Sequence, residues 1–190
     1  MKGRESGMPA QEAWEKFFEP AKILKTLGLN SQVIHAVEFG CGYGTFTIPA
    51  AKVVKGKVYA IDIEPEMIEA TQQEARRQRL NNIETLLRDF ILTGTGLESE
   101  SVDYAMLFNI LHIKNPKSLL QESCRILKPG GKLGIIHWNY DPATPRGPAM
   151  GIRPRPQDCL KWAESAGFTH PRQYDLKPYH YGIILVKTSS

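Results

Sequence analysis

Residues 37–47 read Val37-Glu38-Phe39-Gly40-Cys41-Gly42-Tyr43-Gly44-Thr45-Phe46-Thr47. An apolar run leads directly into three glycines at alternate positions, and a segment of helical character follows. Glycine lacks a Cβ and tolerates positive φ, so such a turn lets the backbone approach a ligand, while the next helix begins with unpaired N–H groups. The stretch therefore predicts a strand, a tight turn and a helix that form a ligand-binding elbow. The alternative is a turn whose glycines serve only its own geometry.

The glycine spacing separates two kinds of cofactor site. A dinucleotide-binding fingerprint, G-x-G-x-x-G, needs its third glycine at position 45, where this chain has Thr45. The observed G-x-G-x-G, preceded by an acidic residue, resembles motif I of the class I S-adenosylmethionine (SAM) methyltransferases, of the small-molecule, methyltransferase-domain-11-like type. In that family the loop wraps the amino-acid part of SAM. The resemblance implies that the cofactor is bound here by Glu38, Gly40, Cys41, Gly42 and Gly44.

Asp62 ends a second predicted strand, about twenty residues beyond the glycines, where α/β cofactor folds place an acceptor for ribose hydroxyls. The surrounding residues 59–67 look like the second SAM motif, which implies that Asp62 and Ile63 contact the cofactor. The alternative is that Asp62 or Glu64 only caps the helix that Pro65 begins.

Two further positions match the family beyond the next strands. Asp89 and Phe90 follow a short strand predicted at 83–87. The resemblance implies that Asp89 bonds the adenine amino group and that the backbone N–H of Phe90 bonds a ring nitrogen. The alternative is that Asp89 only caps a helix or turn. Asn109 follows an apolar strand, at a carboxyl end where ligands of open α/β sheets bind. Downstream, 125–131 resembles the "R-x-L-K-P-G-G" signature, whose Pro129 and Gly130 are also explained by the turn alone.

Strands and helices alternate from residue 33 to 138, and a hairpin follows near the C-terminus. Together with the resemblance, this order implies a three-layer, Rossmann-like α/β sandwich with a seven-stranded, mostly parallel sheet and an antiparallel C-terminal hairpin strand. We expect a single domain of 190 residues. Its parts are an N-terminal helical cap (1–30), a cofactor-binding core (33–138), a substrate loop (139–156), and a C-terminal helix and hairpin (157–190).

Composition excludes several classes of protein. A hydrophobic content of 42% suits a packed core, and the net charge of +4 is spread along the chain, so no nucleic-acid partner is expected. No apolar run is long enough to cross a membrane and no signal peptide is seen, so we expect a cytoplasmic protein without membrane contact. Cys41, Cys124 and Cys159 lack metal-ligand spacing, so no metal is expected. The oligomeric state stays open.

Methyl transfer from SAM is an in-line displacement in which alignment and exclusion of water matter more than a strong acid or base. His112 and His137 follow predicted strands and are candidate bases, with a structural role as the alternative. The chain lacks the N-P-P-Y and D-P-P-Y motifs of enzymes that methylate nucleic acid or glutamine, so a small-molecule acceptor is favoured. A nicotinamide-dependent oxidoreductase and a SAM-binding protein without turnover remain alternatives.

The proline-rich segment 139–156 follows the last core strand, and long loops of this kind are functional or merely connecting. We expect a lid over the acceptor, with Trp138 supplying an apolar wall. Arg153 and Arg155 are predicted to bind an anionic acceptor, with a solvated linker as the alternative.

Overall fold

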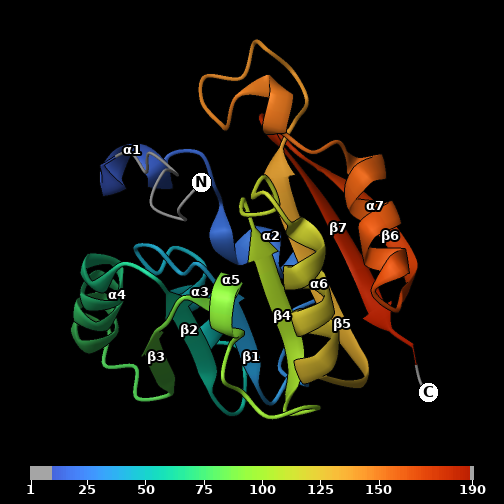
Figure 1. The fold of residues 1–190 in the computed structure, drawn as a ribbon. Helices are drawn as coiled ribbons and strands as arrows, with labels where there is room; N and C mark the ends of the chain where they lie inside the picture. The colour runs from blue at the N-terminus through green and yellow to red at the C-terminus, as the bar shows by residue number, and fades with distance from the viewer. Residues whose placement is uncertain (1–9, 189–190) are drawn as a thin grey trace.

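The computed structural model describes residues 10–188, in which a seven-stranded sheet lies between two layers of helices (Figure 1). The strand order is β3-β2-β1-β4-β5-β7-β6, and only β7 runs antiparallel to its neighbours β5 and β6. The strands are β1 (Ala36–Phe39), β2 (Val58–Asp62), β3 (Ile83–Leu87), β4 (Val102–Phe108), β5 (Leu127–Trp138), β6 (Phe168–Leu176) and β7 (His180–Lys187). The predicted fold class is confirmed.

The helices are α1 (Gln11–Glu15), α2 (Pro20–Thr26), α3 (Thr47–Ala51), α4 (Pro65–Arg77), α5 (Phe90–Thr93), α6 (Pro116–Ile126) and α7 (Pro156–Ser165), with a 3-10 turn, η2, at Met150–Ile152. Within residues 10–188, none of the helices has the length and apolarity that crossing a bilayer requires. Residues 1–9, the beginning of the expected helical cap, lie outside the described part of the chain.

The central strands are buried on both faces, which explains their nearly continuous apolar sequence. Successive residues of β4 alternate between two cores: Ala105 and Leu107 pack with α6 and α7, whereas Tyr104 and Met106 pack with α2 and α3. The sheet thus serves as the shared wall of two hydrophobic layers.

The sequence pattern predicts one amphipathic segment over 9–27 that Pro20 breaks or kinks, a helix over 45–54 and a strand over 172–176, and the structure refines each of these bounds. Helix α3 begins at Thr47 rather than at residue 45, because the turn is closed by a Gly44 N–H bond to the Cys41 carbonyl before the helix starts. The leading apolar segment forms two helices, and Pro20 takes the first position of the second one, where its missing N–H has no intrahelical partner to lose. Strand β6 begins at Phe168 rather than at 172, because an irregularity between Thr169 and Arg172 lets pairing with β7 continue.

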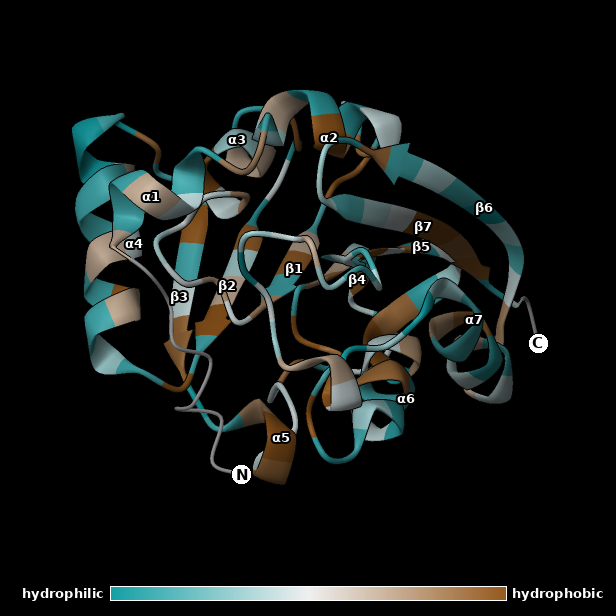
Figure 2. Ribbon diagram, turned by 90° about the horizontal axis from the view of Figure 1, so that it is seen from above, coloured by the Kyte–Doolittle hydropathy of each residue, from teal (hydrophilic) through white to brown (hydrophobic). Residues whose placement is uncertain are grey.

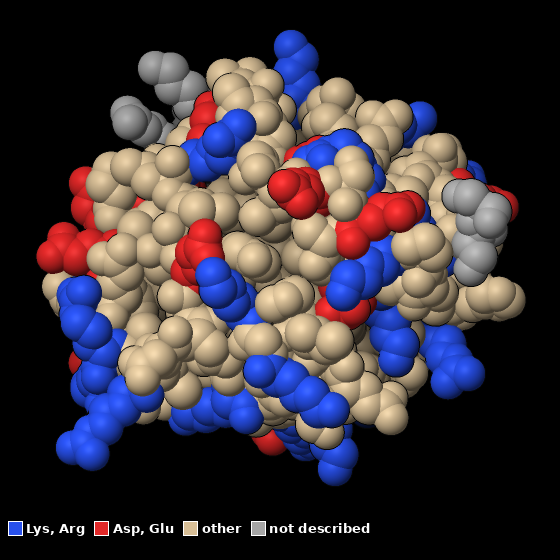
Figure 3. Space-filling model, turned by 90° about the horizontal axis from the view of Figure 1, so that it is seen from below, with Lys and Arg blue, Asp and Glu red and all other residues tan. Residues whose placement is uncertain are grey.

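The face at the amino ends of the parallel strands, seen from below in Figure 3, carries Lys and Arg interspersed with Asp and Glu. Asp103, near the start of β4, joins three segments of the chain. Its carboxylate accepts the backbone N–H groups of Ile34 and His35, at 3.2 and 2.7 Å, and the Lys128 ammonium at 2.8 Å. It therefore ties the entry of β1 to β4 and to the turn at the start of β5.

We predict that Asp103→Ala lowers the free energy of unfolding by about 1 to 3 kcal/mol, because two backbone donors and an ammonium lose their acceptor. Urea unfolding followed by circular dichroism measures the change. Asp175→Ala is the matched control, since Asp175 is 62% exposed and meets only Lys177, at 3.9 Å. Equal effects of the two substitutions would show that Asp103 does not join these segments energetically.

Candidate functional site

A cavity of about 1050 Å³ lies at the carboxyl ends of the parallel strands. Strand order reverses between β1 and β4, and open α/β sheets bind ligands at such a switch point. Figure 2 looks down on this edge of the sheet. The cavity is lined by segments 40–42, 62–64, 89–92, 108–110, 112–115 and 145–149, with Trp14, Glu38, Thr45, Phe46, Met67, Ser118, Trp138 and Ile152.

The structure brings most of the predicted site residues to this one cavity. All the predicted cofactor residues except Gly44 line it, together with His112 and Trp138. His137, Arg153 and Arg155 do not line it. Gly44, the last glycine of the elbow, has a φ of +79°. A Cβ added to it would come within 3.1 Å of Thr71 Oγ1 on α4, so this glycine serves helix packing.

The backbone donors of the elbow are already engaged. The Gly40 and Cys41 N–H groups both donate to the Ile61 carbonyl, at 2.8 and 3.0 Å. The Gly42 N–H donates to Asp62 Oδ2 at 2.9 Å. A loop that cradles phosphate instead points such N–H groups at its ligand. The elbow therefore offers none of these three donors to an anion.

Glu38 is a buried carboxyl group below the elbow, only 3% exposed, and it accepts a hydrogen bond from the Thr47 hydroxyl of α3. Its pKa is raised from 4.5 to about 8, mainly by burial and in smaller part by the nearby charge of Asp62, against the opposing effect of its hydrogen bonds with Thr47. Burial also raises the pKa of Asp62. Two buried acids at one end of the cavity favour a cationic ligand group.

Asp62 links the elbow to the next turn. Its Oδ2 holds the Gly42 N–H, and its Oδ1 accepts the Glu64 N–H at 3.0 Å, just before α4 begins. Glu64 occupies the N-cap position of α4 without a side-chain capping bond. Asp62 therefore supports the turn and also faces the cavity, so the two interpretations of this residue are compatible.

Asp89 is the N-cap of α5, and its Oδ1 accepts the N–H groups of Ile91 and Leu92 at 3.2 and 3.1 Å. Oδ2 makes neither of these bonds, and Asp89 lines the cavity, so capping leaves one carboxylate oxygen for a ligand. The Phe90 N–H donates to the Arg88 carbonyl at 3.0 Å, so a ring nitrogen would have to replace that partner.

Two polar side chains of the cavity lining lack partners. Thr45 Oγ1 is buried without a hydrogen bond, as are both amide atoms of Asn109. Asn109 also has φ of +55°, a strained conformation for a residue other than glycine. Buried polar groups are normally satisfied, so these atoms indicate a place for a polar ligand. Thr45 was not predicted as a site residue, although its place at the missing third glycine was a usable signal.

His112 and His137 form a pair at the ends of β4 and β5. His112 Nδ1 lies 3.3 Å from His137 Nε2, and the two rings meet edge to face. His137 is fully buried and stacks on Tyr181, while His112 reaches the cavity. Burial lowers the pKa of both imidazoles, so both are neutral near pH 7.

Arg153 and Arg155 of the long loop do not line the cavity, unlike Arg146. The Arg153 guanidinium is 7% exposed and bonds the carbonyls of Asn139, Asp141, Arg146 and Pro148 and the Thr144 hydroxyl. Arg155 stacks on Tyr140, with its Cζ 4.1 Å from the ring centroid. Arg153 thus holds the loop in shape, and the expected anionic-acceptor site is not formed by these two side chains.

Other lining residues were not predicted from the sequence, notably Trp14 on α1, Met67 on α4, and Leu92 and Ile152 at the opening. Their apolar character fits core packing equally well, and only the tertiary structure places them around one cavity. The helical periodicity of the leading segment was the one signal for Trp14.

A family model described as a methyltransferase domain matches residues 30–155 of this chain. The chain is 31% identical over 105 residues to ribosomal protein L11 methyltransferase of Dechloromonas aromatica, covering 55% of this chain and 32% of that protein. It is 26% identical over 175 residues to ubiquinone biosynthesis O-methyltransferase of Coxiella burnetii, covering 77% and 67%. The chain spans about a third of the length of the first curated relatives it matches.

Among solved structures, a SAM-dependent methyltransferase from Aquifex aeolicus superposes with a TM-score of 0.81 at 27% identity, covering 93% of both chains. The [4+2]-cyclase SpnF shares the fold at 14% identity, with a TM-score of 0.78 over 98% of this chain and 85% of that one. The motif-based resemblance is therefore confirmed. The family match over residues 30–155 and the shared fold show that this chain belongs to the methyltransferase-domain family, whose cofactor is S-adenosylmethionine.

Proposed function

We propose that the protein transfers the methyl group of SAM to a small-molecule acceptor by in-line displacement. The observation that carries the proposal is the electrostatic character of the elbow. Its buried end holds the carboxyl groups of Glu38 and Asp62, and the N–H groups of Gly40, Cys41 and Gly42 already donate to protein acceptors. Such a surface suits the ammonium and sulfonium cations of SAM.

The same observation disfavours a nicotinamide dinucleotide. A pyrophosphate needs free N–H groups at a helix N-terminus, and here it would meet two buried acids. Isothermal titration with SAM, S-adenosylhomocysteine and NAD(H) distinguishes the two cofactors directly. Binding of NAD(H) without binding of SAM or S-adenosylhomocysteine would overturn the proposal.

The lining residues fit the parts of SAM by their chemistry. Glu38 would hold the ammonium group, Asp62 the ribose hydroxyls, and Asp89 Oδ2 the adenine amino group, while Thr45 and Asn109 offer unpaired polar atoms. Bound SAM supplies an electrophilic methyl group. The protein's own contribution is to orient the acceptor, to exclude water and to accept a proton where the nucleophile carries one.

The base in this proposal is His112, because it is the imidazole that reaches the cavity, with His137 positioning it from behind. A neutral His112 can accept a proton from the acceptor, and the neighbouring ring of His137 fixes its orientation. Because burial lowers the pKa of His112 below 6.5, it is ready to act as a base throughout the neutral range.

We predict that SAM binding releases close to one proton at pH 7. Glu38, with a pKa of about 8, is largely protonated in the free protein and must ionise to pair with the ammonium group. The affinity for SAM should therefore rise with pH, by up to about tenfold per unit, until the pH reaches 8. Isothermal titration in two buffers of different ionisation enthalpy measures the number of protons released.

Glu38→Gln should bind SAM more weakly and release almost no proton from this site. Glu98→Gln, a change at an exposed carboxyl outside the cavity, is the matched control and should behave like the wild type.

Rising pH should have the opposite effect on the stability of the free protein from its effect on SAM affinity. Because the folded protein holds the Glu38 proton more tightly, its free energy of unfolding without SAM should fall as pH rises from 4.5 through 8.

We predict that His112→Gln lowers kcat by about 100-fold or more, the usual contribution of a positioned base, while SAM affinity stays within about twofold. In the wild type, kcat at saturating SAM should be flat above a pKa that is lower than 6.5. Methyl transfer from labelled SAM, measured against pH once an acceptor is identified, checks both statements. His170→Gln, on the exposed part of β6, is the control, and an unchanged kcat in both variants would remove His112 from catalysis.

A further inference from the structure

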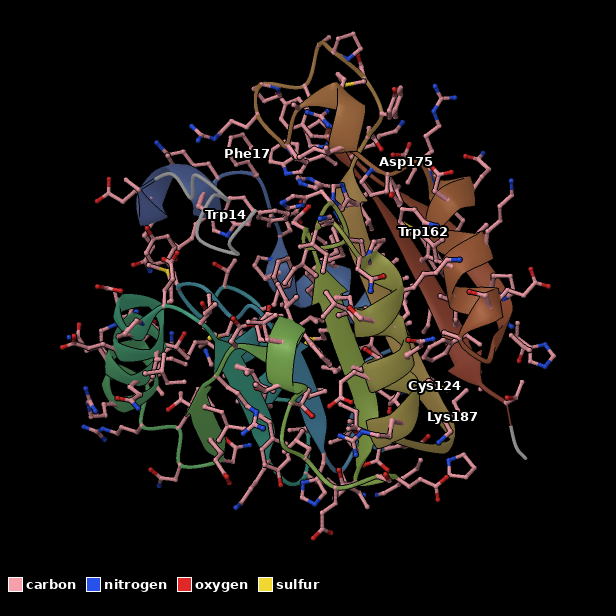
Figure 4. The ribbon with its side chains drawn as sticks, viewed as in Figure 1. Trp14, Phe17, Cys124, Trp162, Asp175 and Lys187 are labelled. Atoms are coloured by element: carbon pink, nitrogen blue, oxygen red, sulfur yellow. The ribbon has the colours of Figure 1, made fainter. Side chains whose placement is uncertain are left out.

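One part of the cavity wall, referred to below as its aromatic end, is formed by aromatic side chains. Trp138, the last residue of β5, is 2% exposed and lies 6.5 Å from Trp14 of α1, centroid to centroid. Phe17 packs edge to face on Trp138 at 5.2 Å. Figure 4 labels Trp14 and Phe17 on neighbouring segments at this end, while Trp162 lies on α7, far from them. Trp14 and Trp138 both line the cavity.

The roof over this wall is the loop segment 145–149. It lies directly on the indole, since a Cβ added to Gly147 would come within 2.9 Å of Trp138 Cγ. The Arg153 bonds to the Arg146 and Pro148 carbonyls hold this backbone in place. The aromatic wall and its roof therefore form a preorganised apolar site, and its shape does not depend on a ligand to order the loop.

Charged groups are distributed unequally around the cavity. The carboxylates that line it are Glu38, Asp62, Glu64 and Asp89, all on the elbow and the turns after β2 and β3. The lining cations, Lys114 and Arg146, are exposed. The enclosed part of the aromatic end thus presents apolar surface and one polar side chain able to take a proton, His112.

Apolar surface continues to the opening of the cavity. Leu92 on α5 is 81% exposed and Ile152 in η2 is 40% exposed, and both line the cavity. Figure 2 shows α5 coloured as an apolar segment. The volume of about 1050 Å³ is at the upper end of the roughly 300 to 1,000 Å³ usual for a small-molecule site, a size that suits a cofactor together with a small acceptor.

We propose that the acceptor is a hydroxylated aromatic compound, a phenol in the broad chemical sense, with its ring on the Trp14–Trp138 wall and its hydroxyl group at His112. This inference rests on the proposed function. The phenolic oxygen forms a bond to the methyl carbon as the carbon–sulfur bond breaks. The electron pair of that bond goes to sulfur, which becomes neutral, and the phenolic proton goes to His112.

The test uses 1-naphthol as the probe, added to protein saturated with S-adenosylhomocysteine and followed by isothermal titration. We expect 1-naphthol to bind, and succinate, inorganic phosphate and ethanolamine not to bind. With methyl-labelled SAM, 1-naphthol should yield labelled 1-methoxynaphthalene. Failure to bind S-adenosylhomocysteine would contradict the proposed function itself, whereas its binding followed by binding of only the polar probes, or of none, would overturn the phenol assignment alone.

Two substitutions locate the probe. Trp14→Ala should weaken 1-naphthol binding by about two- to tenfold, as expected for loss of one aromatic contact, whereas Trp162→Ala should leave it unchanged. Trp14 is only partly buried and α1 has no buried residues, so the fold should tolerate the change. Equal affinities in the two variants would show that the ring does not lie on this wall.

The apolar opening is tested with 4-hexylphenol. Ile152→Asp should weaken its binding by about fourfold or more, roughly the loss of one buried methylene, while Ile34→Asp should have no effect. Ile34 is 45% exposed and lies outside the cavity, which makes it a matched control for a charge placed on an exposed apolar site. Methylation of 1-naphthol that survives His112→Gln at the wild-type rate would overturn the position of the hydroxyl group.

Discussion

The hydrogen bond from the Gly42 N–H to Asp62 joins the turns after β1 and β2, and the geometry of the elbow depends on it. The bond can form only because Gly42 adopts φ of +53° and because the parallel pairing of β1 with β2 brings both carboxyl ends to the same edge. The second carboxylate oxygen holds the turn into α4. The Asp62 side chain thus holds the turns that lead into α3 and α4, and it places a buried acid at the base of the cavity.

Glu38 is the second buried carboxyl group at the elbow. A carboxyl group with a pKa near 8 is destabilising once ionised and unpaired, so a fold that keeps it in the sheet favours a partner that supplies positive charge. An anion-binding elbow of similar shape would leave its N–H groups free and its base uncharged. The chemistry of the side chains below the glycines therefore carries more information about the cofactor than the glycines themselves.

The long loop 139–156 is held in shape by the side chain of Arg153. Arg153 satisfies backbone carbonyls that have no partners in a helix or strand, and its burial against Gly147 and Trp138 makes the roof of the cavity a defined surface. The charge of this arginine is used for loop structure, so its guanidinium is not available to a ligand in the cavity. Proteins similar to this chain are named for different activities, and the fold is shared with a cyclase, so the fold by itself does not identify the acceptor.

By itself the sequence determined the fold class, a mostly parallel seven-stranded sheet with an antiparallel C-terminal hairpin strand. It also pointed to the elbow and to candidate cofactor residues that nearly all line the cavity, because glycine spacing and strand ends are local features that fix where backbone and carboxylates can lie. It also indicated His112, which lies shortly beyond the end of β4, and Trp138, which ends β5. Only the tertiary structure decided that Arg153 is a structural residue, that His137 lies behind His112, and that Trp14 and Ile152 border the cavity. Those assignments depend on contacts between residues far apart in the chain, and apolar or basic side chains look the same in sequence whether they line a cavity or support its walls.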